Sequence, residues 1–146
     1  MFRFLSDTEV ALNELLVACR ASVDHYQDAI KLVEDKEIVS HFHTIASQRK
    51  KFCKQLEDII RELGDLPTVP DPDKETGEMI LHHLGAALSP DYTEEALNQR
   101  LAIEENIMGL IDTARGTQMK AAHEKFLDSL ATHIQETIGF LAKSLD

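Results

Sequence analysis

The amino-acid sequence predicts an all-α fold, a four-helix bundle that forms a single domain over residues 1–146. Apolar residues recur at helical spacing in four long segments, and the connections within the first pair and within the second pair are short. A long stretch between residues 64 and 91 separates the two pairs. Short connections make neighbouring helices antiparallel, whereas a long crossover lets the third helix start at the far end. We therefore expect an up-down-down-up bundle.

The first helix is predicted to run from Asp7 to Glu34. Ser6 and Glu9 have the spacing of a capping box, in which a hydroxyl and a carboxylate satisfy amide donors that would otherwise be unpaired. Residues seven positions apart mark its apolar face, namely Leu12, Cys19, Tyr26 and Val33. This spacing indicates a helix with one face in the core.

The second helix is predicted from Lys36 to Leu63, where Gly64 ends it and the prolines that follow prevent its continuation. Its apolar positions are Ile38, Phe42, Ile45, Phe52, Leu56, Ile59 and Leu63. Within the crossover, residues 75–88 again show helical apolar spacing. We expect a short extra helix there, lying across the bundle.

The third helix is predicted from Tyr92 to Arg115, with Gly116 as its stop. Thr117 is predicted to cap the fourth helix, which extends from Gln118 to about Leu145. The apolar face of the third helix comprises Leu97, Leu101, Met108 and Ile111. That of the fourth comprises Met119, Ala122, Phe126, Leu130, Thr137 and Phe140.

Three polar residues, Arg49, Glu104 and His133, interrupt these apolar faces near the middle of their helices. Inward-facing residues at mid-height of a bundle should meet, and an unpaired buried charge is costly, so they are expected to bind one another. We predict a buried polar network of Arg49, Gln48, Glu104 and His133. Two alternatives remain open: one or more of them turns to solvent, or Glu104 and His133 ligate a metal.

The two cysteines, Cys19 and Cys53, fall on the predicted core faces of the first helical hairpin. If these two helices form a hairpin that turns near Lys36, the cysteines are expected at nearly the same height, since each helical residue rises about 1.5 Å. Neither belongs to a Cys-x-x-Cys motif, so a zinc or thioredoxin-type site has no support. A buried pair of thiols is the simplest interpretation. A redox disulfide is the alternative, which a reducing compartment disfavours.

The charge of the chain disfavours nucleic-acid binding through phosphates, because 26 acidic residues against 15 basic residues give a net charge of −11. No apolar run approaches the roughly 20 residues that a membrane-spanning helix needs. The first residues lack the pattern of a signal peptide. We therefore expect a cytoplasmic protein without a membrane span.

The chain from about Thr8 to Leu145 resembles a bacterial family of ferritin-like four-helix bundles, a domain of unknown function. The residues that carry the resemblance are residues 11–15 (Ala-Leu-Asn-Glu-Leu), Cys19, residues 35–38 (Asp-Lys-Glu-Ile), Phe42, Phe52, residues 84–88 (Leu-Gly-Ala-Ala-Leu), Glu104 and His133. The positions that match ferritin metal ligands are Val23, Gln48, Lys51, Glu104, Leu130 and His133. Only Glu104 and His133 keep ligand side chains there, so the resemblance implies the fold with a degenerate metal site.

We therefore expect a non-enzymatic protein that acts in a stress response or in protein interaction. We expect it to need no cofactor. Its partner would be a second copy, bound through an exposed apolar helix face, or an unidentified protein. The alternative is a protein that binds one Fe, Mn or Zn ion through Glu104 and His133. The sequence has no Glu-x-x-His motif, and a di-iron centre needs about four carboxylates and two histidines. A third interpretation is a small-molecule binder with a cavity near Glu104.

Overall fold

The computed structural model describes residues 6–64 and 92–146, and these residues form four α-helices and no strand. The helices are α1 (Asp7–Ile30), α2 (Lys36–Glu62), α4 (Tyr92–Arg115) and α5 (Ala121–Ser144). The predicted all-α class is therefore confirmed. The short helix predicted at residues 75–88 lies outside the described residues.

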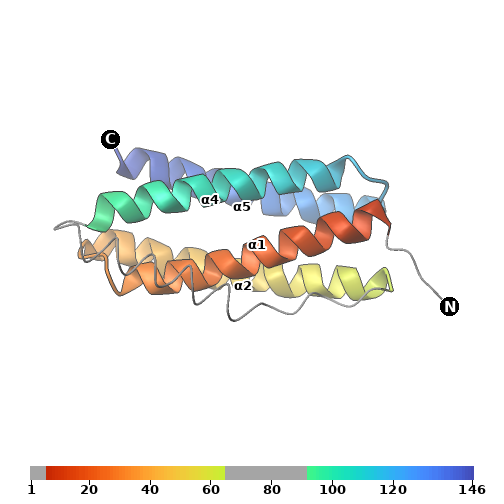
Figure 1. Cartoon of the computed structure of the whole chain (residues 1–146), viewed down its shortest axis with the longest axis horizontal. Helices are drawn as coiled ribbons and strands as arrows, with labels where there is room; N and C mark the ends of the chain where they lie inside the picture. Colours follow the sequence, from red (N-terminus) through yellow and green to blue (C-terminus); the bar gives the residue numbers. More distant parts are fainter. Residues whose placement is uncertain (1–5, 65–91) are drawn as a thin grey trace.

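The four helices are arranged as two hairpins, α1 with α2 and α4 with α5, stacked on each other along a common long axis (Figure 1). In Figure 1, α1 and α5 run from right to left, whereas α2 and α4 run from left to right. The hairpins pack mainly through α1 and α4, and α2 and α5 touch far less than the other neighbouring pairs. One seam of the bundle is therefore more open than the other three.

The ends of α1 show why its predicted length was too great. Ser6 Oγ accepts a hydrogen bond from the Glu9 amide at 3.1 Å, so the helix begins where the capping pattern predicts. It ends at Ile30, short of the predicted Glu34. The Asp35 carboxylate caps α2 by accepting from the amide of Glu37 at 3.0 Å. The residues between Ile30 and Asp35 must therefore leave the helix so that the chain can reverse its direction.

The start of α5 also differs from the prediction, since the helix begins at Ala121 and not at Gln118. The Thr117 hydroxyl donates to the Ala114 carbonyl at 2.6 Å, so it satisfies an acceptor at the end of α4 and does not cap α5. The N-cap position is Lys120, whose side chain makes no capping hydrogen bond. The predicted cap at Thr117 is wrong because the hydroxyl serves the preceding helix.

The core between the helices is mostly aliphatic, with a few large polar side chains enclosed in it. Its fully buried apolar side chains include Leu12, Leu15, Leu16, Phe42, Leu56, Ile60, Ile107, Ile111 and Leu127. Arg49, Arg100 and Glu104 are buried among them, each at most 2% exposed. Across the described helices, none is long and apolar enough to cross a membrane.

Candidate functional site

The centre of the bundle is organised by Arg49, which α2 holds inside the core at 0% exposure. Its Nη2 donates to Glu104 Oε1 on α4 at 2.8 Å, and its Nε donates to His133 Nε2 on α5 at 3.0 Å. Three helices thus bring together the three polar residues that interrupt the apolar faces. The guanidinium lies between a carboxylate and an imidazole and binds both.

Helix α1 completes the network with two residues, Ser22 and Tyr26. Arg49 Nη1 donates to Ser22 Oγ at 2.8 Å, and that hydroxyl donates to the backbone carbonyl of Cys19 at 2.7 Å. The Tyr26 hydroxyl donates to Glu104 Oε1 at 2.5 Å. The seven-residue spacing placed Tyr26 on the apolar face of the helix. The sequence could have indicated a polar role for Tyr26, because a buried tyrosine hydroxyl generally needs a hydrogen-bond partner.

The charges in this network stabilise one another. Burial lowers the pKa of Arg49, but the charge and hydrogen bond of Glu104, together with Tyr26 and Cys19, outweigh burial, so the pKa lies above its ordinary value. Burial, followed by the charge of Glu104, raises the pKa of Tyr26 well above its ordinary value. The guanidinium therefore stays charged and the phenol stays protonated, as their hydrogen bonds to the carboxylate require.

His133 is the neutral member of the network. Burial, with a smaller contribution from the charge of Arg49, lowers its pKa to about 4. At neutral pH the ring is uncharged, and because Nε2 accepts from Arg49 the proton belongs on Nδ1. The ring also stacks on Phe52, with the two ring centroids 5.0 Å apart.

A second buried cation, Arg100, lies one helical turn before Glu104 on α4. Its Cζ is 5.7 Å from the centroid of the Tyr26 ring, and that of Arg49 is 5.8 Å from the same centroid. Burial lowers the pKa of Arg100, while the charges of Glu104 and Asp28 act in the opposite direction. The charge of Glu104 thus raises the pKa of both buried guanidinium groups.

Gln48 does not belong to the buried network. It is exposed and lines a groove on the surface, so its placement in the network is corrected. The reason is helical geometry, since Gln48 precedes Arg49 and adjacent residues point about 100° apart around a helix. Arg49 faces inward, and Gln48 therefore faces outward.

The network has part of the chemistry of a metal site, but its two candidate ligands are already engaged. Glu104 Oε1 and His133 Nε2 both accept hydrogen bonds from Arg49. Glu104 Oε2 is buried and has no hydrogen-bond partner. Of the other matched positions, Val23 and Leu130 are buried and apolar. Within residues 6–64 and 92–146, no three His, Cys, Asp or Glu side chains are grouped as a metal site.

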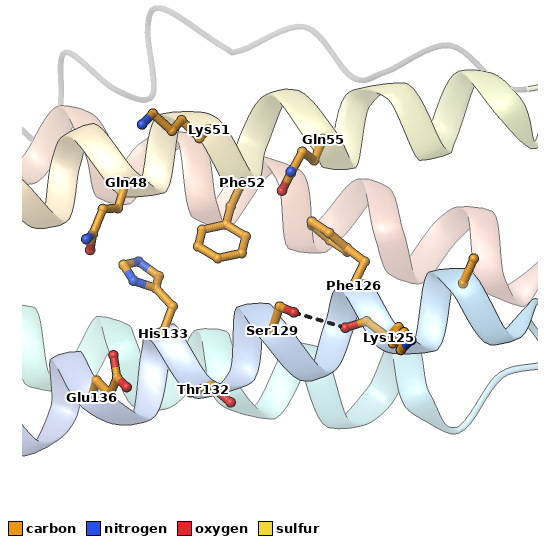
Figure 2. A pocket seen from close by; sticks show the side chains of 11 residues that line it. Gln48, Lys51, Phe52, Gln55, Lys125, Phe126, Ser129, Thr132, His133 and Glu136 are labelled. Carbon is orange, nitrogen blue, oxygen red and sulfur yellow. Dashed lines mark hydrogen bonds between the residues drawn. The ribbon is translucent and has the colours of Figure 1, made fainter.

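The open seam between α2 and α5 forms a surface groove of about 710 Å³, here called the α2–α5 groove. Figure 2 shows Phe52 and His133 between the two helices, with Phe126 beside them. The polar residues at its edges are Gln48, Lys51, Gln55, Lys125, Ser129, Thr132 and Glu136. The groove therefore joins the surface to the edge of the buried network at His133.

Comparisons with protein-family models, curated proteins and solved structures found no match to the chain. The ferritin-like resemblance accordingly stays a prediction.

Proposed function

We propose that this chain is a non-enzymatic, ferritin-like bundle of up-down-down-up order, in which Arg49 takes the place of a metal ion and which acts through protein interaction. The observation that carries the proposal is that one guanidinium donates to both Glu104 and His133. A metal ion between these side chains would neutralise the same carboxylate and accept the same imidazole lone pair. Arginine supplies that charge permanently, because its guanidinium does not lose its proton in proteins.

The groove between α2 and α5 supplies the interaction surface, and we infer that its partner is a second copy of the chain. Phe52 and Phe126 are only partly buried there, with ring centroids 6.1 Å apart. Lys125 and Glu136 lie on the groove side of α5, near opposite ends of the groove. A two-fold axis that is perpendicular to α5 would bring the two copies of the groove together in antiparallel orientation. Lys125 of each copy would therefore face the partner's Glu136.

Sedimentation or light scattering over a range of concentrations tests this association. We expect a reversible dimer, and Lys125→Glu should weaken its association by at least about tenfold because two carboxylates then face each other. The double variant Lys125→Glu with Glu136→Lys should restore the dimer, since the charges are exchanged but remain complementary. Lys31→Glu is the matched control, because Lys31 is exposed and lies outside the groove.

A wild-type chain that stays monomeric at its solubility limit would contradict the dimer. So would a charge-exchanged variant that remains as weak as Lys125→Glu alone, because the predicted pairing would then be absent.

Metal binding is the second candidate function, and the unpartnered Glu104 Oε2 is the observation that favours it. Under this alternative, one Fe, Mn or Zn ion binds Glu104 and His133 after Arg49 moves aside. Elemental analysis of protein purified without chelator decides between the two. We expect less than one ion per chain. A stoichiometric metal that is lost in both Glu104→Ala and His133→Gln would instead establish the alternative.

A further inference from the structure

Cys19 on α1 and Cys53 on α2 form a buried pair of thiols next to the central network. Both are free thiols and both are buried, as the simpler interpretation of the sequence expects. The two thiols lie close enough for each to shift the pKa of the other, although the cysteines come from different helices.

The two thiols differ in their access to solvent. Cys53 is 7% exposed and lines a surface hollow of about 480 Å³, whereas Cys19 is 1% exposed and does not line it. Three cations surround this hollow, namely Arg20, Lys50 and Lys54. Two acids, Asp24 and Glu57, also line it, and Glu57 forms an ion pair with Arg20 at 2.5 Å. A small polar molecule therefore reaches Cys53 before Cys19.

The pKa values of the two thiols differ in the direction that also favours reaction at Cys53. The hydrogen bond from Cys19 lowers the pKa of Cys53; burial opposes this, and the charges of Arg49 and Arg20 reinforce it. The same hydrogen bond and burial raise the pKa of Cys19 well above its ordinary value. Cys53 is thus the sulfur that ionises first, and Cys19 is the protonated donor beside it.

We propose that Cys53 and Cys19 form a dithiol that reacts with hydroperoxides, in which Cys53 attacks the peroxide and Cys19 closes a disulfide between α1 and α2. The thiolate of Cys53 attacks one peroxide oxygen, so an S–O bond forms and the O–O bond breaks. The alkoxide or hydroxide that leaves takes up a proton. Cys53 becomes a sulfenic acid, oxidised by two electrons, and the peroxide is reduced to an alcohol or water.

The second step uses the neighbouring thiol. The sulfur of Cys19 attacks the sulfur of Cys53, an S–S bond forms, and the S–O bond breaks. The hydroxide that leaves combines with the Cys19 proton as water. One peroxide is consumed for each disulfide that forms, so the reaction is a stoichiometric modification of the chain.

The test treats the reduced, folded, full-length protein with a small excess of hydrogen peroxide at neutral pH, followed by denaturation, alkylation and mass spectrometry. We expect the wild type to lose two hydrogens, to take up no alkylating agent, and to yield a peptide that links Cys19 to Cys53. Dithiothreitol should reverse all three changes. Two thiols still alkylated after peroxide, or a disulfide between two chains, would overturn the proposal.

Two serine variants assign the roles. In Cys19→Ser, Cys53 should be trapped as a sulfenic acid by dimedone, because the resolving thiol is gone. In Cys53→Ser, the remaining Cys19 should react at least about tenfold more slowly, since it is protonated and less accessible. Equal rates in the two variants, or a faster Cys19, would refute the assignment. Circular dichroism of both variants confirms that folded proteins are being compared.

Discussion

Replacing Glu104 with glutamine tests the central network most directly, because the side chain keeps its shape and loses its charge. Arg49 and Glu104 are both 0% exposed and are joined at 2.8 Å. The substitution would leave the guanidinium of Arg49 buried without its counter-charge, and Arg100 would lose part of its own. Removing one partner of a buried ion pair costs about 3–5 kcal/mol, so Glu104→Gln should lower the free energy of unfolding by that amount.

Urea unfolding followed by circular dichroism measures this loss, and the chain offers a matched control. Arg115 and Asp128 form an ion pair of similar length, 2.7 Å, but their side chains are 37% and 68% exposed. Because water screens an exposed pair, Asp128→Asn should change the free energy of unfolding by less than about 1 kcal/mol. The difference between the two variants isolates the effect of burial.

The reasoning is refuted if Glu104→Gln costs no more than Asp128→Asn. A double variant adds a second criterion, since Arg49→Met removes the cation that Glu104→Gln leaves unpaired. The combined loss should be smaller than the sum of the two single losses by at least about 1 kcal/mol. Strict additivity would show that the two charges do not depend on each other.

Three further outcomes follow from the same contacts. Tyr26→Phe removes the hydroxyl that donates to Glu104, and it should lower the free energy of unfolding by about 1.5–3 kcal/mol in urea titrations. The pKa of His133 is lowered to about 4 in the folded state. Its contribution to the free energy of unfolding is therefore complete above the unfolded pKa of about 6.5 and declines as the pH falls toward 4. This decline should total at most about 3 kcal/mol, and His133→Gln should lack it when unfolding is measured across that range. Oxidation that joins Cys19 to Cys53 should raise the free energy of unfolding by about 3–4 kcal/mol, an increase that Cys53→Ser would abolish.

The sequence was sufficient to predict three of the polar positions inside the bundle, although it did not reveal the buried Arg100. The helical period places Arg49, Glu104 and His133 on buried faces, and the cost of an isolated buried charge predicts that they meet. The same period places Gln48 outside, since it lies about 100° around the helix from Arg49, so the helical geometry alone excludes it from the network.

Other features depend on tertiary structure and could not be predicted from spacing. The hydroxyls of Ser22 and Tyr26 lie on an apolar face, and only the packing of α1 against α2 and α4 shows which groups they bind. The hydrogen bond from Thr117 to the end of α4 depends on the path of the short loop between α4 and α5. The open seam between α2 and α5 is likewise a property of how the two hairpins stack.

The arrangement of the cysteines could be predicted only in part from the sequence. Their common height follows from helical rise, and the structure makes them neighbours within one hairpin. Their difference in access does not follow from the sequence, because it depends on the surface hollow beside Cys53.

The cation at the heart of this bundle is covalently attached to the polypeptide. It is present as soon as the chain is synthesised, it cannot dissociate, and a chelator cannot extract it. Folding of the chain around Arg49 should therefore be a unimolecular step, and its rate should not depend on the concentration of any metal ion.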